Sequence, residues 1–376
     1  MKQKKTILAL NVGSSSIKYS LFQNEECIFS GEEEKVFTKK QRYSSLSKIF
    51  SELEKRRIKP DAVVHRVVHG KDFRKPEIID VMLIKKLKKI AELAPLHEIP
   101  EVQAIEFCKE RLEAENKNSG KKKAVQIAVF DTSFYADMPE KNAIYGIPYR
   151  FYKKGIRKYG FHGISHKYVT NELKEFMNEK GKIISCHLGN GSSVTAVVNG
   201  KAIDTSMGFT PLEGLIMGTR SGSIDPAIIP YLIKYEKMSI AEISSMLNNE
   251  SGLLGISGMS GDMKTLLKNK EKNRKAKFAV EVFIDRVVKQ IGSYAAMMNG
   301  VDAIVFTGGI GEHNSYIRNE ISKNLLFLGV KIDRKMNNKL NFTKKIQISF
   351  KSSKVKIFAV KTDEMLEMVI EAKSII

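Results

Sequence analysis

The sequence predicts an α/β protein built from two related domains. Its 376 residues exceed the length at which one hydrophobic core normally keeps growing, and 42% of them are apolar, enough to give each domain a core. Strand and helix patterns alternate along the chain, which is typical of α/β folds. A strand, a serine-rich turn and a second strand occur twice, at residues 7–22 and 183–204. Together these observations favour a duplicated α/β domain with a cleft between its halves.

The repeated pattern consists of an apolar strand, a polar residue with glycine and serines, and a second β-rich strand. Its two copies read LNVGSSSIKYSLF and HLGNGSSVTAVV. After the second copy, Asn199-Gly200 predicts a tight hairpin turn because both residues tolerate positive φ, and residues 23–25 form a looser counterpart. Two short hairpins can also resemble each other by chance, so this motif alone leaves the duplication open.

The remaining elements fit the same plan. The chain turns through Pro139, Gly146 and Pro148, which favours a domain border in that region. Thr362-Asp363-Glu364 has the composition of a cap for a last helix. The other expected elements, in chain order, are a buried strand at 61–68, an amphipathic helix at 85–93, a strand ending in an aspartate at 124–134, a helix at 278–300, a strand meeting glycines before another helix at 301–313, and a strand at 355–360.

Composition argues against secretion and membrane insertion. The basic start is followed by an apolar run that Asn11 and Gly13 interrupt, and no small-residue cleavage site follows. No later stretch is apolar for long enough to span a bilayer. Three cysteines, Cys27, Cys108 and Cys186, are odd in number and sparse, which fits reduced thiols in core or strand positions. We therefore expect a soluble, cytoplasmic protein with no membrane partner.

The net charge of +21 raises the possibility of nucleic-acid binding. The charges are dispersed, however, and the lysine runs at 121–123 and 268–277 lie in polar segments that predict solvated loops. No helix-turn-helix, zinc or aromatic RNA-binding signature accompanies them. The sequence thus predicts no specific nucleic-acid partner.

Three glycine-rich turns, at 13–16, 189–193 and 308–311, share the chemistry of phosphate binding. Each exposes backbone N–H groups, and the first two add serine hydroxyls. None is a Walker A loop, because no lysine-serine pair leads from glycines into a helix, and no dinucleotide fingerprint is present. Each turn taken singly is weak evidence for phosphate binding, because glycine-serine hairpins are more often only hairpins.

A few ionisable residues are embedded in apolar or glycine-rich segments, where a charge needs a partner. Arg66 ends a buried strand, His162 and His166 lie in YGFHGISH, and Arg220 lies in MGTRSGSIDP. An arginine between glycines is poorly explained by packing, so an anionic ligand is the favoured partner. A histidine in this context is often structural. The seven histidines are scattered, which argues against a histidine metal site.

The motifs, in their order, resemble those of the acetate kinases. They are LNVGSSSIKYSLF, HRVVHG, LAPLH, VFDTSF, GIRKYGFHGISHKYV, CHLGNGSSV, DTSMGFTPLEGLIMGTRSGSIDP, FTGGIGE and TDE, and they extend from Ile7 to about Glu367. The resemblance implies an actin-like (ribonuclease H-like) phosphotransferase fold with two duplicated βββαβαβα domains around a nucleotide cleft. By this resemblance residues 1–133 plus 365–376 form the N-terminal domain, and residues 134–364 form a C-terminal domain with most nucleotide contacts.

The family reaction is the reversible, Mg²⁺-dependent transfer of the ATP γ-phosphoryl group to acetate, which gives acetyl phosphate and ADP. The resemblance therefore implies a small carboxylate and a nucleotide as partners, Mg²⁺ or in its place Mn²⁺ as cofactor, and a homodimer. Propionate kinases share these motifs and butyrate kinases share them more loosely. Both remain alternatives, as does an actin-like ATPase without a carboxylate acceptor.

The resemblance assigns roles residue by residue. Arg66 would bind the acetate carboxylate and the transferring group, Arg220 would clamp the phosphoryl oxygens, and His162 would donate a hydrogen bond to them. Asp131 would position Arg66 or the nucleophile, and Glu364 with Asn11 would hold the metal. Several like charges meet in such a site, which explains the two arginines. No general base is needed, because a carboxylate is already ionised at neutral pH.

The acceptor and nucleotide contacts follow from the same resemblance. An apolar wall of Val68, Leu96, Phe161 and Pro211 predicts acetate as the best acceptor, propionate as weaker and butyrate as poor. Four departures from the family pattern affect the assignments: Lys264 for arginine, His313 for asparagine, Lys71-Asp72, and Glu98-Ile99. The implied nucleotide contacts are Ser14, Ser16, Lys18, His187, Asn190, Gly191, Asp262, Met263, Lys264, Gly309, Ile310, Gly311 and His313.

Overall fold

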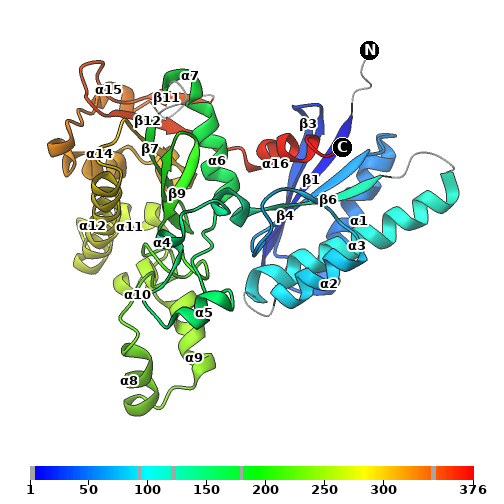
Figure 1. Ribbon diagram of the computed structural model, residues 1–376, viewed down its shortest axis with the longest axis horizontal. Helices are drawn as coiled ribbons and strands as arrows, with labels where there is room; N and C mark the ends of the chain where they lie inside the picture. Colours follow the sequence, from blue (N-terminus) through cyan, green and yellow to red (C-terminus); the bar gives the residue numbers. More distant parts are fainter. Residues whose placement is uncertain (1–4, 92–94, 120–123, 178–180, 340–343) are drawn as a thin grey trace. The chain divides into compact units, whose positions relative to one another are not determined.

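The computed structural model describes residues 5–91, 95–119, 124–177, 181–339 and 344–376 (Figure 1). It divides into two compact units, Met1–Ala136 with Asp363–Ile376 (unit 1) and Asp137–Thr362 (unit 2). The borders therefore fall at 136/137 and 362/363 and not at the expected 133/134 and 364/365. The reason is that the short helix after the last strand of unit 1 and the whole C-terminal helix belong to unit 1, so Glu364 belongs to the same unit as Arg66.

Unit 1 contains a mixed sheet of six described strands in the order β3-β2-β1-β4-β6-β5. The first three form an antiparallel meander, β4 and β6 continue the sheet in parallel with β1, and the edge strand β5 is antiparallel. The strands are β1 (Thr6–Val12), β2 (Ser16–Gln23), β3 (Glu26–Glu34), β4 (Ala62–Val67), β5 (Glu77–Ile78) and β6 (Val125–Phe130).

Unit 2 repeats this topology in the order β11-β12-β10-β7-β8-β9. An antiparallel meander is again followed by two parallel strands and an antiparallel edge strand, which confirms the duplication. The predicted hairpin turn joins β8 to β9, with φ of 53° at Asn199 and 76° at Gly200. The strands are β7 (Lys182–Leu188), β8 (Ser192–Val198), β9 (Lys201–Thr205), β10 (Ala303–Thr307), β11 (Lys345–Gln347) and β12 (Lys356–Val360).

Helices cover both faces of the unit 1 sheet. Figure 1 shows α16 (Glu364–Lys373) on one side of the sheet and α1 (Lys39–Lys55) with α3 (Pro95–Ser119) on the other. The core on the second side joins Leu8 and Leu10 of β1 to buried residues of α1 and α3. Helix α2 (Val81–Ile90) begins four residues before the predicted position 85, because the Asp80 carboxylate caps it by accepting from the N–H of Leu83.

Unit 2 is built around the long helix α12 (Arg274–Met297), whose Phe283, Val287 and Ile291 are fully buried. The other helical segments of this unit are α4 (Glu140–Ala143), α5 (Tyr149–Lys153), α6 (Gly163–Glu172), α7 (Lys174–Met177), α8 (Ile228–Tyr235), α9 (Ile240–Ser245), the π-helix η3 (Met246–Glu250), α10 (Gly252–Ser257), α11 (Met263–Asn269), α13 (Gly308–His313), α14 (Ser315–Lys323), the 3₁₀-helix η4 (Leu326–Leu328) and α15 (Arg334–Asn337).

Two local predictions need correction. The stretch 268–277 is not a loop throughout, because α11 ends at Asn269 and α12 begins at Arg274, where the Asn273 side chain caps it. The glycines after β10 do not precede a helix. They form the first turn of helix α13.

The lysine run at 121–123 lies outside the described residues. The three cysteines are free thiols, with Cys27 exposed on β3 and the other two buried.

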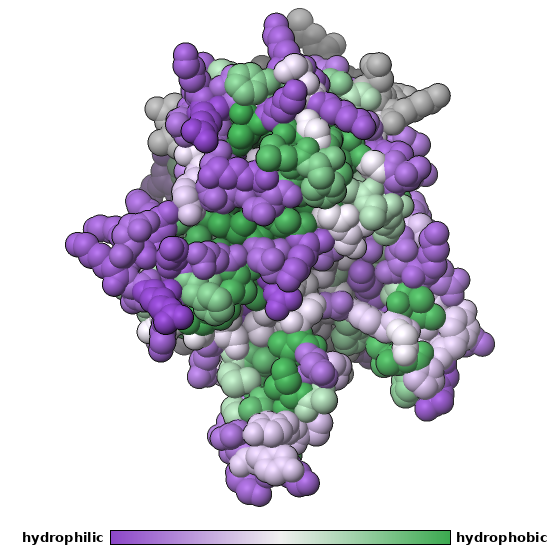
Figure 2. All heavy atoms as spheres, turned by 90° about the vertical axis from the view of Figure 1, so that its left-hand side faces the viewer, coloured by the Kyte–Doolittle hydropathy of each residue, from purple (hydrophilic) through white to green (hydrophobic). Residues whose placement is uncertain are grey.

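Helix α8 carries an exposed apolar surface. Figure 2 shows apolar side chains on the lower lobe of the face it presents, where α8 lies, and no residue of this helix is buried. Ile228, Ile229, Tyr231, Ile233 and Tyr235 are between 38% and 59% exposed. Exposed apolar patches of this kind are typical of interaction surfaces. Within the described part of the chain, no helix has the length and low charge needed to cross a bilayer.

Candidate active site

The predicted catalytic residues of unit 1 lie where its parallel strands end. In α/β sheets, ligands bind at the carboxyl ends of the strands. Leu10 of β1 and His65 of β4 lie opposite each other. Asn11 and Arg66 are the next residues of these two strands. Asp131 directly follows β6 and begins the 3₁₀-helix η1 (Asp131–Tyr135). Because the strands are parallel, these three side chains emerge at one edge of the sheet.

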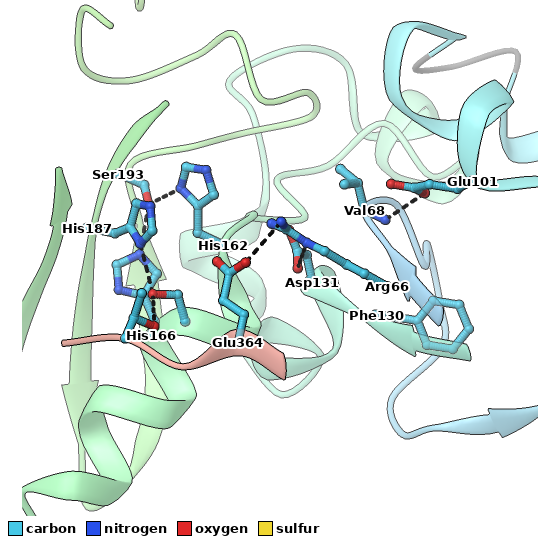
Figure 3. A network of polar contacts seen from close by, with 12 residues as sticks. Arg66, Val68, Glu101, Phe130, Asp131, His162, His166, His187, Ser193 and Glu364 are labelled. Carbon is cyan, nitrogen blue, oxygen red and sulfur yellow. Dashed lines mark hydrogen bonds and ion pairs between the residues drawn. The ribbon is translucent and has the colours of Figure 1, made fainter. Parts of the chain in front are cut away.

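Arg66 is held by two carboxylates (Figure 3). Its Nε and Nη2 donate to the two oxygens of Asp131, at 3.1 and 2.7 Å, and its Nη1 donates to Oε2 of Glu364 at 3.1 Å. The side chains of Asp131, Arg66 and Glu364 are 1%, 14% and 17% exposed. This fork-to-fork pairing fixes the guanidinium plane, which a single ion pair would leave free to rotate.

Burial alone would lower the pKa of the Arg66 guanidinium. The charges of Asp131 and Glu364 outweigh that effect, so the net shift of this pKa is upward. Among the described residues, these bonds engage three of the five N–H groups of the guanidinium, which leaves two for an anion. The cluster therefore offers a permanently charged, rigidly oriented donor.

The segment after Arg66 is hydrogen-bonded to helix α3. The Val68 N–H donates to the buried carboxylate of Glu101 at 3.0 Å (Figure 3), and the Gly70 N–H donates to the Thr132 hydroxyl at 3.0 Å. A Cβ at Gly70 would lie 2.6 Å from the Phe130 ring, so the position requires glycine. Val68, a predicted wall residue, is thus fixed through its backbone. The side chain of Leu96, another wall residue, lies outside the described residues.

The serine turn of unit 1 connects β1 to β2. The Gly13 N–H donates to the Ser16 carbonyl at 2.8 Å, which closes the turn and leaves Ser14 exposed at its tip. Lys18, on β2, is 57% exposed and pairs with Glu32 at 3.7 Å. Ser14 therefore has the exposure that a phosphate contact requires.

A second group of polar side chains lies in unit 2 (Figure 3). His162 precedes α6 with a left-handed backbone, φ 57°, a conformation that is costly for a residue with a Cβ and typical of functional sites. Its Nδ1 lies 2.9 Å from the Ser193 hydroxyl, and its ring stacks on His187 at 4.4 Å. The Ser165 hydroxyl links His187 Nδ1 to Thr362.

His166 lies deeper in the same group and is fully buried. Its two ring nitrogens contact the hydroxyls of Ser185 and Ser193 at 2.8 and 2.7 Å. Burial, and secondarily the neighbouring His187, holds its pKa well below the ordinary value, so the ring is neutral. This environment is typical of a structural histidine, the interpretation that the sequence favours.

Arg220 and the predicted phosphate loop meet beside His162. A Cβ built on Gly191 would lie 3.1 Å from His162 Nε2 and 3.8 Å from Arg220 Nη1, so the three residues are neighbours. The Asn190 carbonyl accepts from the Gly218 N–H at 2.9 Å, which joins the two loops. Burial lowers the pKa of Arg220. This group brings together four predicted site residues of unit 2.

The hydroxyls of the 189–193 turn are not available to a phosphate, contrary to expectation. Ser192 bonds to the backbone of Gly189, and Ser193 bonds to the two histidines. Both serines are fully buried. The turn offers backbone N–H groups and the exposed Asn190, because β8 begins at Ser192 and turns the hydroxyls inward.

The two wall residues of unit 2 are anchored differently. Phe161 is 1% exposed, and the Pro211 carbonyl accepts from Arg220 Nη1 at 3.4 Å. The loop that carries Pro211 is fixed by Tyr145, whose hydroxyl donates to Glu213 and accepts from the Phe209 N–H. Burial, followed by the bond to Glu213, raises the pKa of Tyr145, so it stays a donor.

The predicted adenosine contacts differ in exposure: some are accessible to a nucleotide, and others are buried. Asp262 caps α11 through the N–H groups of Lys264 and Thr265, and the exposed Lys264 side chain remains free to turn outward. Met263 is 3% exposed, and its side chain packs within the core. Gly309 and His313 are exposed, whereas Ile310 packs against the core and Gly311 is buried.

Sequence reasoning missed a buried carboxylate, Glu312, although its motif FTGGIGE was recognised. Its Oε1 accepts from the Thr307 hydroxyl, the Gly308 N–H and the Thr362 N–H, at 3.0 to 3.2 Å. It thereby ties the glycine turn after β10 to the end of β12. The sequence does contain a signal for this buried carboxylate. It is a glutamate directly after a glycine turn with no lysine or arginine next to it in the chain.

The side-chain oxygens of Asn11 and Glu364, the predicted metal ligands, are of the kind that Mg²⁺ prefers. This ion is commonly bound by one or two carboxylates together with water and substrate phosphates. Glu364 uses Oε2 for Arg66, and its Oε1 has no hydrogen bond among the described residues. Asn11 supplies an amide at the same strand edge. No cluster of three or more His, Cys, Asp or Glu residues with metal-binding geometry occurs in the described ranges, so a metal here would need further ligands from water or substrate.

Comparison with known proteins gives a consistent result. The model of the acetokinase family matches residues 25–371. The acetate kinases of Halothermothrix orenii and Acetivibrio thermocellus are 43% and 42% identical to this chain, and each alignment covers 96% of it and 96% or 97% of the relative. The structure of Porphyromonas gingivalis acetate kinase has a TM-score of 0.88 at 34% identity, covering 99% of both chains. A propionate kinase structure from Francisella tularensis has a TM-score of 0.88 at 38% identity, covering 99% and 100%.

Proposed function

Because this chain belongs to the acetokinase family, we propose that it catalyses reversible transfer of the ATP γ-phosphoryl group to acetate, with Mg²⁺ as cofactor. The observation that carries the proposal is the oriented Arg66 guanidinium at the end of β4, with two N–H groups left for an anion. An acetate carboxylate needs such a donor, and it needs no base, because it is already ionised.

We propose that residues of both units serve this one reaction. Arg66 binds the acetate carboxylate and the transferring group, and Asp131 keeps the guanidinium in its plane. Arg220 and His162, neighbours beside Gly191, bind the phosphoryl oxygens in the transition state. Charge spreads over those oxygens during transfer, so fixed donors stabilise the transition state more than the ground state.

The metal proposal rests on Glu364 and Asn11. When bound, Mg²⁺ neutralises charge on the β- and γ-phosphoryl oxygens. Glu364 supplies its unengaged carboxylate oxygen, and Asn11 supplies its amide oxygen; Mn²⁺ accepts the same ligands. The ion pair with Arg66 orients the Glu364 carboxylate.

Glu364→Ala is expected to raise the Mg²⁺ concentration needed for half-maximal activity, in addition to the stability lost with its ion pair to Arg66. The structure offers a matched control, because the helix cap is Asp363, whose Oδ1 accepts from the Leu366 N–H. Asp363→Ala should cost about 0.5–2 kcal/mol of stability and leave the Mg²⁺ requirement unchanged. An unchanged Mg²⁺ requirement in Glu364→Ala would rule out the metal role.

For the nucleotide, we propose contacts from both units. Ser14, Ser16 and Lys18 line the phosphate chain, and His187, Asn190 and Gly191 contact it from unit 2. Asp262, Lys264, Gly309, Ile310, Gly311 and His313 surround adenosine, with Met263 contributing only its backbone. The exposure of Asn190, Lys264, Gly309 and His313 supports these assignments.

The acceptor preference is proposed to be acetate, then propionate, then butyrate. Val68→Ala should improve kcat/KM for propionate relative to acetate by about 10-fold or more, because one methylene in a fitted pocket changes discrimination by roughly 1–3 kcal/mol. The backbone bond to Glu101 does not involve the Val68 side chain, so the position survives the substitution. The measurement is kcat/KM for the three acids in both proteins. A wild-type preference for propionate would favour the propionate kinase alternative, which the propionate kinase structure keeps open.

The activity itself is tested by trapping acyl phosphate with hydroxylamine in the presence of ATP, Mg²⁺ and a panel of short carboxylates. Hydroxamate formation with acetate supports the proposal. ATP hydrolysis without hydroxamate would instead indicate an actin-like ATPase.

We also propose a cytoplasmic location, which the free cysteines support. We further propose that the protein is a homodimer, and light scattering measures this oligomeric state directly.

A further inference from the structure

One buried hydroxyl connects the two histidines of YGFHGISH. Ser193 Oγ lies 2.9 Å from His162 Nδ1 and 2.7 Å from His166 Nε2 (Figure 3). On the far side of His166, Nδ1 lies 2.8 Å from the Ser185 hydroxyl. Ser185, His166 and Ser193 are fully buried, so water does not compete for these contacts. The four side chains form one unbranched hydrogen-bonded chain from β7 to the start of α6.

The direction of this chain follows from the number of protons. Ser193 has a single hydroxyl proton and two histidine nitrogens beside it, so it donates to one and accepts from the other. The Ser185 hydroxyl has no further hydrogen bond among the described residues. If it accepted from His166, its own proton would be buried without an acceptor, which is more costly than leaving a lone pair unused. Ser185 is therefore the donor to His166 Nδ1.

The remaining bonds are then determined. His166, with Nδ1 as an acceptor, carries its hydrogen on Nε2 and donates it to Ser193. Ser193 in turn donates to His162 Nδ1. We infer that Ser193 is a positioning residue that fixes His162 in the tautomer with its hydrogen on Nε2. The importance of this tautomer for turnover rests on the proposed function, in which His162 donates to the phosphoryl oxygens.

Three further observations agree with this assignment. His162 Nε2 faces Gly191 and Arg220, the region proposed for the phosphoryl group. The left-handed backbone of His162 and the stack on His187 fix the ring plane, so that the hydrogen on Nε2 has a defined direction. Burial keeps His166 neutral, and a neutral ring has one donor and one acceptor, as the chain requires.

The test is the tautomer of His162, read from long-range ¹H–¹⁵N correlation spectra of the full-length protein labelled with ¹⁵N-histidine. The His162 resonance is assigned from its loss in His162→Gln. We expect a protonated Nε2 and an unprotonated Nδ1 in the wild type. In Ser193→Ala, and to a smaller degree in Ser185→Ala, the Nδ1-protonated form should gain population. A wild-type His162 with its hydrogen on Nδ1 would overturn the inference.

Kinetics separate this inference from the proposed function. Ser193→Ala should lower kcat by about 10- to 100-fold, less than loss of the donor itself, while KM for ATP changes little. Ser193→Thr, which keeps the hydroxyl, should restore both the tautomer and kcat. Ser322→Ala removes a buried serine whose hydroxyl donates to the Arg318 carbonyl and has no other hydrogen bond among the described residues, so it should change neither the tautomer nor kcat. An Nε2 tautomer with full activity in His162→Ala would leave the inference standing and reject the proposed role of His162.

Discussion

Arg66→Ala and Arg220→Ala are each expected to lower kcat by about 10²- to 10⁴-fold, the range seen when a preorganised charge stabiliser is removed. Both side chains are held in fixed directions, Arg66 by Asp131 and Glu364, and Arg220 by its loop and the Pro211 carbonyl. Lysine should restore little activity, because a point charge does not reproduce a planar fork. The measurement is steady-state kinetics with acetate, ATP and Mg²⁺.

Stability has to be measured alongside activity for Arg66. Removing it leaves the Asp131 carboxylate buried without its cation, and breaking such a pair typically costs about 3–5 kcal/mol. Arg66→Lys keeps a positive charge beside Asp131 and is the matched control, since it should fold better than Arg66→Ala while remaining nearly inactive. Near wild-type kcat in either lysine variant, with an unchanged unfolding temperature, would contradict the proposed roles.

His162→Ala is expected to lower kcat by about 10²- to 10³-fold and to leave ATP affinity nearly unchanged. The reason is that the His162 hydrogen bond strengthens as charge develops on the transferring group. Calorimetry of ATP binding separates this role from a nucleotide contact. The opposite pattern, with ATP binding lost and kcat preserved, would place His162 in the nucleotide site. His162→Gln supplies an N–H at similar reach and should recover part of the activity.

The sequence predicted those parts of the fold that are determined by local patterns. The buried strand that carries Arg66 and the hairpin turn at Asn199-Gly200 follow from hydrophobic periodicity and turn chemistry, and both occur as expected. The duplication followed from two similar hairpins and is confirmed by the strand orders of the two sheets. Arg66, near the end of one predicted strand, and Asp131, at the end of another, could be located in this way, whereas their roles came from the resemblance.

Contacts between distant segments could not be predicted in this way. The bond between Arg66 and Glu364 joins residues 298 positions apart, and nothing local indicates it. Ser193 belongs to a glycine-serine pattern that suggested phosphate binding, but its place on β8 opposite His187 turns the hydroxyl toward the histidines. Met263 follows a capping aspartate, which does not show that its side chain enters the core. The position of each depends on strand pairing and packing, which the local sequence does not encode.

The division of unit 1 between the two ends of the chain has a consequence for biosynthesis. Helix α16 packs on β1 and β4 and buries Met368, Val369 and Ala372, so the sheet lacks one of its covers until this helix, which follows unit 2 in the chain, has left the ribosome. Translation of unit 2 intervenes, which takes about 10–45 s at the usual rate of about 5–20 residues per second. During that interval the face of the N-terminal sheet that α16 covers stays exposed. Glu364 arrives with the same helix, so the proposed metal site forms only after unit 2 has been translated.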